Sequence, residues 1–443
     1  DGRLKPQHQI IGVGQAEGEI RSVVNMPLYK VVRLIRGEKG TRVRLRITKS
    51  SGGIPKDIGI VRDVVELEDS AATGSVKPKT TADGRELPVG YINLPSFYVD
   101  WDAQREGDPN ARSATGDVRK LVEKMIENDE IEALIIDLRS NGGGSLPESI
   151  SLAGLFIPNG PVVQVHQADG EVNVKRDDDN GLSFDLPLVL LTSHASASAS
   201  EIFAGAMQDY GRAVLIGSEQ THGKGTVQQI LRMRRYPGMR DLKPGALKYT
   251  MAKFYRVTGH STQFKGVVPD IVMPSFYDHM DIGERSLDHA LPWDEIEPCE
   301  YEPVDNSVSR YLPRLKARSA ERREQNEDFQ KLVKEIQRYG KRQQENQVPL
   351  NYQARLERWQ QDQKWSDRIT AIFDREPPET DDDTNELDKQ GQSPEETPQT
   401  NGDDADQEDD DTTDFVLQEG LAVAADLCEM IAADREAEKG AAK

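Results

Sequence analysis

The spacing of apolar residues divides the 443-residue chain into segments of different character. Residues 10–14 and 43–47 are predicted to be short strands, and the second alternates apolar and polar positions as a half-buried strand does. Between them, residues 27–35 have the spacing of an amphipathic helix. We therefore expect a small, mostly β domain over residues 1–70, followed by a polar linker at 71–88.

The middle of the chain, residues 89–275, alternates predicted strands and helices. Its fully apolar runs are typical of strands that are buried on both faces of a parallel sheet. Strands that alternate with helices imply an α/β fold, in which the helices cover the sheet. The strands are expected at 89–94, 133–136, 186–192 and 213–217, and the helices at 117–126, 147–155 and 200–207.

The C-terminal part has three sections. Residues 276–373 are rich in charged residues and Gln with helical spacing, and we expect Trp359 and Trp365 to pack inside this helical domain. Residues 374–414 hold 18 acidic and 2 basic residues, a composition typical of a disordered linker. Residues 415–443 return to helical apolar spacing, so the linker is expected to space a terminal helix from the rest.

The formal net charge of the chain is −21, and the acidic linker accounts for most of it. This charge argues against a nucleic-acid binder, which needs a basic face. The sequence contains no stretch of about 18 apolar residues, so it does not predict a membrane-spanning helix. Two cysteines, Cys299 and Cys428, exclude a disulfide-dense scaffold and a cysteine zinc cluster, and leave a single disulfide undecided. The histidines show no metal-like spacing, so we expect neither a metal nor a cofactor.

The first candidate for chemistry is the turn at residues 137–144, which ends in Gly142, Gly143 and Gly144. Glycines between a buried strand and a helix leave backbone N–H groups accessible beside the positive end of the helix dipole. Such a turn suits an oxyanion or a phosphate. A tight structural turn explains the same glycines, and both interpretations stay open.

The second candidate is the segment Ser196–Phe203, which also lies between a buried strand and a helix. Small residues on both sides of Ser198 would let a substrate carbonyl approach its hydroxyl, as glycines do in a nucleophile elbow. The alternative is an N-cap made by Ser198 or Ser200, with Glu201 in the first turn. Without a partner base, the segment by itself favours the cap.

The third candidate is Thr221–Gln228, in which Lys224 lies between two glycines. A desolvated lysine loses its proton more readily and can then serve as general base for a serine. His222 is a rival base in the same segment. A phosphate-binding P-loop is excluded, because Ser218 and Gly225 occupy positions that this motif reserves for Gly and for Ser or Thr.

The three segments, in this order, resemble those of the C-terminal processing peptidases, in particular the tail-specific protease branch. The resemblance covers about residues 1–370 and implies a crotonase- or ClpP-like serine protease core at 89–275. A partial PDZ domain would precede this core, and an α-helical C-terminal domain would follow it. The motifs that carry the resemblance are IIDLRSNGGG at 135–144, SASASEIFAGAMQDYGRA at 196–213, GKGTVQ at 223–228 and FYRVTGHSTQFKGVVPDIVMP at 254–274.

The resemblance also implies roles for individual residues. Ser198 would be the nucleophile, Lys224 the general base, and Gln228 the residue that orients the lysine. The oxyanion hole would combine the backbone N–H of Ala199 with that of one glycine. The matching motifs do not decide which of two glycines contributes it. Those two glycines are Gly143 and Gly144, and the supporting positions are Glu201, Asp209 and Thr221.

These roles would make the protein a serine endopeptidase that recognises the C-terminus of protein substrates and processes or degrades them. Members of the family act in the bacterial periplasm or envelope, and an adaptor protein or self-association is a further expectation. The resemblance also implies that the opening strand and carboxylate-binding loop of the PDZ domain are missing here. The sequence would then be a C-terminal fragment that binds C-terminal peptides poorly.

Two functions of other classes compete with this one. The first is a catalytically inactive PDZ-type binding scaffold, against which the intact Ser198, Lys224 and Gln228 argue. The second is a crotonase-like acyl-CoA enzyme, which would share the fold and a glycine-built oxyanion hole. The serine segment and the PDZ remnant argue against the second.

Overall fold

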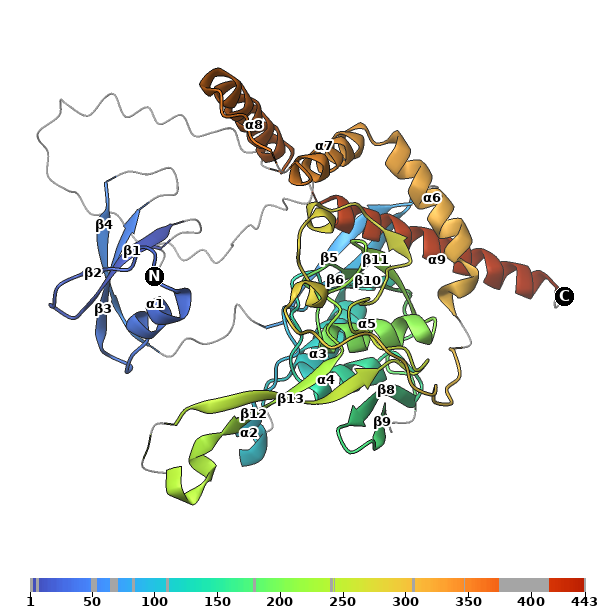
Figure 1. Cartoon of the computed structure of the whole chain (residues 1–443). Helices are drawn as coiled ribbons and strands as arrows, with labels where there is room; N and C mark the ends of the chain where they lie inside the picture. The colour runs from blue at the N-terminus through green and yellow to red at the C-terminus, as the bar shows by residue number, and fades with distance from the viewer. Residues whose placement is uncertain are drawn as a thin grey trace, which may run out of the picture. The chain divides into compact units, whose positions relative to one another are not determined.

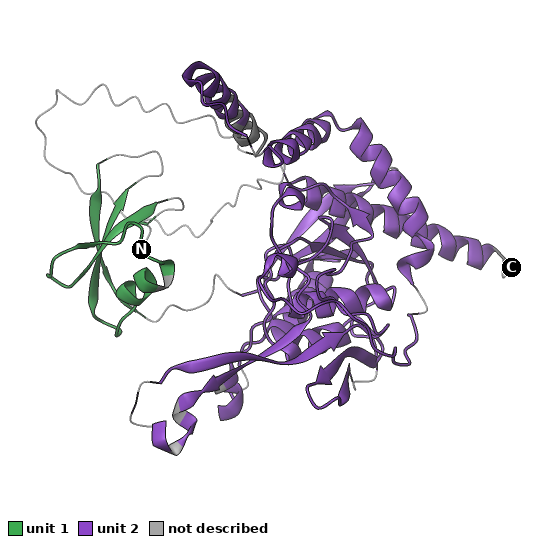
Figure 2. Ribbon diagram, viewed as in Figure 1, with its two compact units in different colours: residues 1–70 green, residues 71–443 purple. Residues whose placement is uncertain are grey.

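The structure is a computed structural model in two compact units, Asp1–Ser70 and Ala71–Lys443 (Figure 2). The predicted acidic linker at 374–414 lies outside the described residues, apart from Asp414. The structure describes residues 3–4, 8–48, 54–63, 71–81, 84–108, 111–177, 181–239, 242, 244–304, 307–345, 347–373 and 414–441.

The first unit is a four-stranded antiparallel sheet with one helix, as predicted for residues 1–70. In strand β3, Val43, Leu45 and Ile47 are buried while the residues between them are more exposed, because successive side chains of a strand point to opposite faces. The elements are β1 (Gln9–Gln15), β2 (Arg21–Ser22), α1 (Leu28–Ile35), β3 (Arg42–Thr48) and β4 (Lys56–Val61), with strand order β2-β1-β3-β4.

The second unit is built on a six-stranded sheet with the order β14-β11-β10-β7-β6-β5. Its strands pair in parallel except for β5, which is antiparallel to β6. The predicted linker at 71–88 is therefore wrong, since most of it forms an edge hairpin of the sheet. The strands are β5 (Thr73–Thr80), β6 (Glu86–Asn93), β7 (Ala133–Asp137), β10 (Leu188–Thr192), β11 (Ala213–Gly217) and β14 (Ile271–Val272).

One face of this sheet is covered by three helices that the apolar spacing predicts. In β7, Leu134 and Ile136 point into this layer, whereas Ala133 and Ile135 point into the opposite one. The continuous apolar runs in the sequence thus arise because both faces of each central strand are buried. The helices are α3 (Ala114–Asp129), α4 (Leu146–Gly154) and α5 (Ala199–Asp209).

The opposite face is covered by helices from the end of the chain, above all α9 (Phe415–Ala441) (Figure 1). Leu421, Val423 and Leu427 of α9 lie in the same core cluster as Ile135 and Leu191 of the sheet. The terminal helix is therefore part of the core, and the expectation that a linker spaces it from the rest is wrong. The other helices of this region are α6 (Leu312–Gln325), α7 (Glu327–Gln343) and α8 (Tyr352–Phe373).

A second, four-stranded sheet has the order β12-β13-β8-β9, and its β12–β13 hairpin extends away from the core (Figure 1). The apolar spacing did not predict this sheet. Its strands are β8 (Gly160–Gln167), β9 (Val172–Asp177), β12 (Thr226–Arg232) and β13 (Ala246–Tyr255). The shorter elements are α2 (Trp101–Glu106), η2 (Met233–Arg235), η3 (Pro237–Met239), η4 (Phe276–His279), η5 (Glu284–Ser286) and η6 (Val308–Arg310).

Three predictions about single features can be compared with the structure. Cys299 and Cys428 are both free thiols, so they do not form a disulfide. Trp365 stacks on Tyr339 with ring centroids 5.8 Å apart, whereas Trp359 is exposed and does not pack as expected. None of the helices that the structure describes is long and apolar enough to cross a bilayer.

Candidate active site

Ser198 lies in the turn between strand β10 and helix α5, with φ at 57° and ψ at −110°. A residue with a Cβ atom rarely adopts this backbone conformation, because Cβ then crowds the neighbouring peptide groups. Such strain is the mark of a nucleophile elbow, in which a sharp strand-to-helix turn presents the hydroxyl. The small neighbours Ala197 and Ala199 let the chain make this turn.

The serines that flank Ser198 tie its turn to the glycine turn at 137–144. The Ser196 hydroxyl donates to the carbonyl of Leu138 at 2.7 Å, and the Ser200 hydroxyl donates to the carbonyl of Asn141 at 2.8 Å. Ser200 is therefore not the cap, and Ser198 holds the N-cap position of α5 with Glu201 in the first turn, as the alternative prediction allowed. The backbone N–H of Glu201 donates to the carbonyl of Ser198 at 2.9 Å, so the backbone takes part in starting the helix.

The glycine turn packs directly against Ser198. Gly143 has φ at +104°, and a Cβ atom there would lie 2.9 Å from the Cβ of Ser198. Gly144 has φ at +148°, and its Cβ would lie 2.3 Å from the carbonyl oxygen of Phe97. Both positions therefore need glycine for the backbone angle and for space.

The N–H groups of this turn differ in their partners. That of Gly143 donates to the Asn141 side chain at 2.9 Å. Those of Gly144 and Ala199 have no acceptor within the described part of the chain. Of the three N–H groups expected for an oxyanion hole, those of Gly144 and Ala199 could therefore donate to an oxyanion without losing another acceptor.

Lys224 lies in a loop shaped by its two glycine neighbours. Gly223 has φ at +86° and packs on the backbone of Phe264, and the N–H of Gly225 donates to the Gln263 side chain at 2.8 Å. The Lys224 Nζ donates to Oε1 of Gln228 at 3.3 Å. Burial lowers the pKa of Lys224, and the positive charge of nearby Lys248 lowers it further.

The rival base, His222, faces a different partner. Its Nδ1 lies 3.9 Å from Oε2 of Glu284, and its backbone N–H donates to the carbonyl of Ser196 at 2.9 Å. Burial lowers the pKa of His222, which favours the neutral ring. The loop thus brings two bases with lowered pKa values near the serine turn, and of these Lys224 donates to Gln228.

Glu201 joins the serine turn to the lysine loop from a fully buried position. Its Oε2 accepts the backbone N–H of Ser198 at 2.8 Å and that of Lys224 at 2.9 Å. Its Oε1 accepts the Thr221 hydroxyl and the N–H of Gly223, each at 2.6 Å. Burial raises the pKa of Glu201 to about 7, against the effect of these four donors.

The other two predicted supporting residues differ in their positions. Thr221 lies at the site, where its hydroxyl also accepts the N–H of Val267 at 2.8 Å. Asp209 lies at the opposite end of α5 from Ser198, and its carboxylate binds the Arg256 guanidinium at 2.6 and 3.0 Å. The structure thus brings Thr221 to the serine and lysine turns but not Asp209.

Two buried polar residues that support these turns were not singled out from the sequence. Asn141 orients the glycine turn, and Gln263 binds both the lysine loop and Glu284, the latter at 3.2 Å. Asn141 and Gln263 lie within the motifs that carry the resemblance, which was the available signal. Polar residues in loops are usually exposed, so their burial could not be foreseen.

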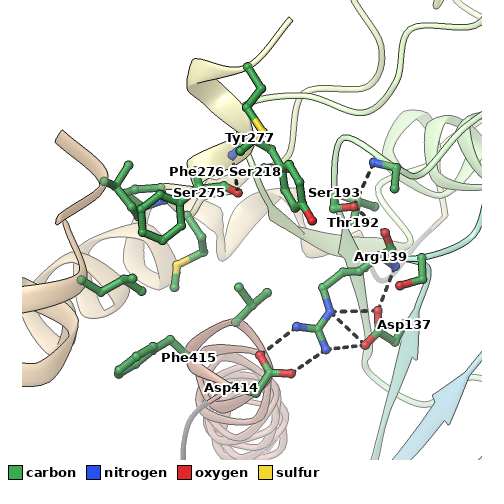
Figure 3. A pocket seen from close by; sticks show the side chains of 18 of the residues that line it. Asp137, Arg139, Thr192, Ser193, Ser218, Ser275, Phe276, Tyr277, Asp414 and Phe415 are labelled. Atoms are coloured by element: carbon green, nitrogen blue, oxygen red, sulfur yellow. Dashed lines mark hydrogen bonds and ion pairs between the residues drawn. The ribbon is translucent and has the colours of Figure 1, made fainter. Parts of the chain in front are cut away.

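A cavity of about 910 Å³ lies at the carboxyl ends of the central strands, and neither Ser198 nor Lys224 is among the described residues that line it (Figure 3). Its lining includes Arg139, Thr192, Ser193, Phe276 and Phe415. Among the residues that the structure describes, no group of three or more His, Cys, Asp or Glu side chains could hold a metal ion.

The second unit has the fold of an α/β peptidase core with a helical C-terminal region. Residues 88–273 match the model of peptidase family S41, and residues 277–429 match that of the C-terminal domain of tail specific protease. The chain belongs to the C-terminal processing peptidases of family S41, as the resemblance of its motifs predicts.

Individual relatives agree with this assignment. The tail-specific protease of Haemophilus influenzae is 38% identical over 432 residues, which cover 96% of this chain and 56% of that protein. The carboxy-terminal-processing protease of Bartonella bacilliformis is 31% identical, over 60% of this chain and 56% of its own. The chain therefore spans a little over half the length of these relatives.

A solved structure of a single domain is similar to a small part of the chain. The PDZ domain of the carboxy-terminal protease of Vibrio cholerae, in complex with peptide, is 38% identical over 14% of this chain and 63% of that one, with a TM-score of 0.13.

Proposed function

We propose that this protein is a serine endopeptidase in which Ser198 is the nucleophile and Lys224 the general base. The observation that carries the proposal is the shared carboxylate of Glu201. Because its Oε2 accepts the N–H groups of both Ser198 and Lys224, the two turns are held to one atom. A serine on a strained turn and a lysine with a lowered pKa are the two parts that a serine–lysine dyad needs.

The chemistry follows from these groups. Neutral Lys224 takes the hydroxyl proton of Ser198 as the serine oxygen attacks the peptide carbonyl. The backbone N–H groups of Ala199 and Gly144 stabilise the oxyanion, because neither is committed to another acceptor in the described part of the chain. The protonated lysine then protonates the leaving amine, and water resolves the acyl-enzyme.

Gln228 has the role of orienting the base. Its side-chain oxygen accepts from Lys224 Nζ at 3.3 Å, and β12 holds it four residues beyond the lysine. An amide oxygen can accept from lysine in either protonation state without adding charge. This partner therefore fixes the direction of the amine without raising its pKa as a carboxylate would.

The proposed substrates are proteins that the enzyme recognises at their C-termini. The motifs of the first unit resemble those of a PDZ domain, and such domains bind an extended C-terminus as an added strand of their sheet. The names of the Haemophilus and Bartonella relatives support this choice of substrate. By the same resemblance, we place the protein in the periplasm or envelope, with an adaptor or a second copy of the chain as a further partner.

The test is the cleavage of one protein substrate in two forms that differ only in the last few residues, one apolar and one charged. The wild type should cleave the form with the apolar tail faster. Ser198→Ala and Lys224→Ala should each abolish the cleavage, whereas His222→Ala should retain most of it. Unchanged cleavage by Ser198→Ala would contradict the proposal and favour a non-catalytic scaffold.

A further inference from the structure

Arg139 stands where strand β7 leads into the glycine turn, and its guanidinium lies between two carboxylates (Figure 3). Its Nη1 and Nη2 donate to the Asp414 carboxylate at 2.8 and 2.7 Å. Its Nε and Nη2 donate to Oδ2 of Asp137 at 2.9 and 2.6 Å. One side chain thus connects the central strand with the C-terminal helix, although 275 positions separate Arg139 from Asp414.

This connection stays charged at neutral pH. Burial disfavours the ionised form of Asp414, but the hydrogen bonds and charge of Arg139 outweigh burial and hold the pKa of Asp414 below its ordinary value. Burial also acts against the Arg139 cation, and its two carboxylate partners still raise the pKa of Arg139. A partly buried bidentate pair of this kind has a defined geometry as well as attraction.

Asp414 also begins helix α9. Its Oδ1 accepts the backbone N–H of Leu417 at 3.0 Å, as an N-cap side chain does. The same oxygen accepts from Arg139. The seating of α9 on the sheet and the orientation of Arg139 therefore depend on one carboxylate.

The backbone at Arg139 connects to the candidate active site within two residues. Its N–H donates to Oδ1 of Asp137 at 2.9 Å, and its carbonyl accepts from the Ser193 hydroxyl. Asn141 follows two residues later. Its carbonyl accepts the N–H of Ala197 at 3.0 Å, and its side chain accepts the N–H of Gly143. A shift of the backbone at Arg139 would therefore move both the glycine turn and the serine turn.

We propose that Asp414 is a positioning residue, which fixes the glycine turn through Arg139 and so keeps the oxyanion hole competent. This inference rests on the proposed peptidase function for its catalytic consequence. Its structural part, that Asp414 holds the glycine turn, is independent of the chemistry.

The test compares two charge-removing variants of the same helix in the full chain. Asp414→Asn keeps a good capping residue but loses the charge that holds Arg139. Asp426→Asn is the matched control, because Asp426 pairs with Arg318 and Arg322 of α6 and contacts neither turn. Two quantities are measured for each: amide hydrogen exchange of peptides covering residues 138–145, and kcat and KM for a peptide substrate.

For Asp414→Asn we expect kcat to fall about tenfold while KM changes less than about twofold, since an oxyanion donor is displaced but the substrate is still bound. Exchange in 138–145 should become about tenfold faster, because the turn opens more often. Asp426→Asn should match the wild type in both.

Unchanged exchange of 138–145 in Asp414→Asn, or an equal rise in Asp426→Asn, would overturn the inference. If the wild type fails to cleave any peptide, the proposed function fails, and the exchange measurement still decides whether Asp414 holds the turn.

Discussion

The backbone N–H groups of Ser198 and Lys224 donate to the same atom, Oε2 of the buried Glu201, at 2.8 and 2.9 Å. Two segments more than 20 residues apart in the chain are thereby fixed relative to one carboxylate. The serine turn and the lysine loop cannot move apart without leaving a buried carboxylate oxygen short of donors. The geometry of the site therefore depends on Glu201 as much as on Ser198 and Lys224.

Glu201→Gln should reduce both stability and activity. A glutamine replaces one acceptor oxygen by an NH₂ group, which would point at two N–H donors in one orientation and at the Gly223 N–H and the Thr221 hydroxyl in the other. A buried polar mismatch costs about 1–3 kcal/mol per group. We expect the free energy of unfolding in urea to fall by about 2–4 kcal/mol. The matched control is Glu148→Gln on α4, where the carboxylate accepts the single backbone N–H of Thr115 and the loss should be smaller.

The titration of Glu201 should also make the free energy of unfolding depend on pH. Burial raises its pKa to about 7 from an ordinary value of 4.5, so in that interval the native state binds a proton that the unfolded chain has lost. Its contribution to the free energy of unfolding is thus fully present below about 4.5 and is lost as the pH rises through about 7. Glu201→Gln should remove this decline, and an unchanged pH profile would contradict the assignment.

Activity should rise with pH as Lys224 loses its proton, at a lower pH than an ordinary lysine would allow. Because the positive charge of Lys248 helps to lower the pKa of Lys224, Lys248→Gln should move the rising limb of kcat/KM to higher pH. Lys334→Gln, which removes the same charge from the exposed face of α7, should leave the limb in place. A shift to lower pH, or none, in Lys248→Gln would argue against Lys224 as the base.

Neighbouring glycines of the oxyanion turn should respond differently to alanine. At Gly143 the added Cβ would meet Ser198 in a left-handed backbone, and we expect kcat to fall about 10²-fold as the turn is displaced. At Gly142 a Cβ has no neighbour within 4 Å, so Gly142→Ala is the control and should stay close to wild type. Equal losses at the two positions would show that the turn does not depend on the contact with Ser198.

Helix α9 should be indispensable to the core. Leu427→Ala removes a fully buried side chain from the cluster beneath the sheet, and such truncations cost about 2–5 kcal/mol. Glu436→Ala, on the exposed last turns of the same helix, should change stability by less than about 0.5 kcal/mol. Thermal or urea unfolding checks both. A Leu427→Ala variant as stable as the wild type would mean that α9 does not dock as described.

The sequence predicts the central strands well and the edges poorly, for a physical reason. Strands β7, β10 and β11 are buried on both faces, which forces uninterrupted apolar runs. Strand β5 is an edge strand that contains Lys77, Pro78 and Lys79, so its composition suggests a linker although its backbone pairs with β6. An edge strand does not need apolar residues on both of its faces.

The serine and the lysine of the proposed dyad could be singled out because their motifs are specific, whereas the groups that hold them could not. Asn141, Gln263 and Arg139 act through loops that meet only in the folded chain. The apolar stripe of α9 likewise indicates that the helix is buried, but not that it packs on the sheet. The supporting residues and the packing of α9 depend on contacts between residues that are far apart in the sequence.

The most direct test of the proposed dyad is labelling by a fluorophosphonate, followed by mass spectrometry of the modified peptide. We expect one label, on Ser198, formed by the wild type at a rate that rises with pH, and formed at least about 10²-fold more slowly by Lys224→Ala. His222→Ala should label at close to the wild-type rate. A label on another residue, or a Lys224→Ala variant that reacts as fast as the wild type, would contradict the account.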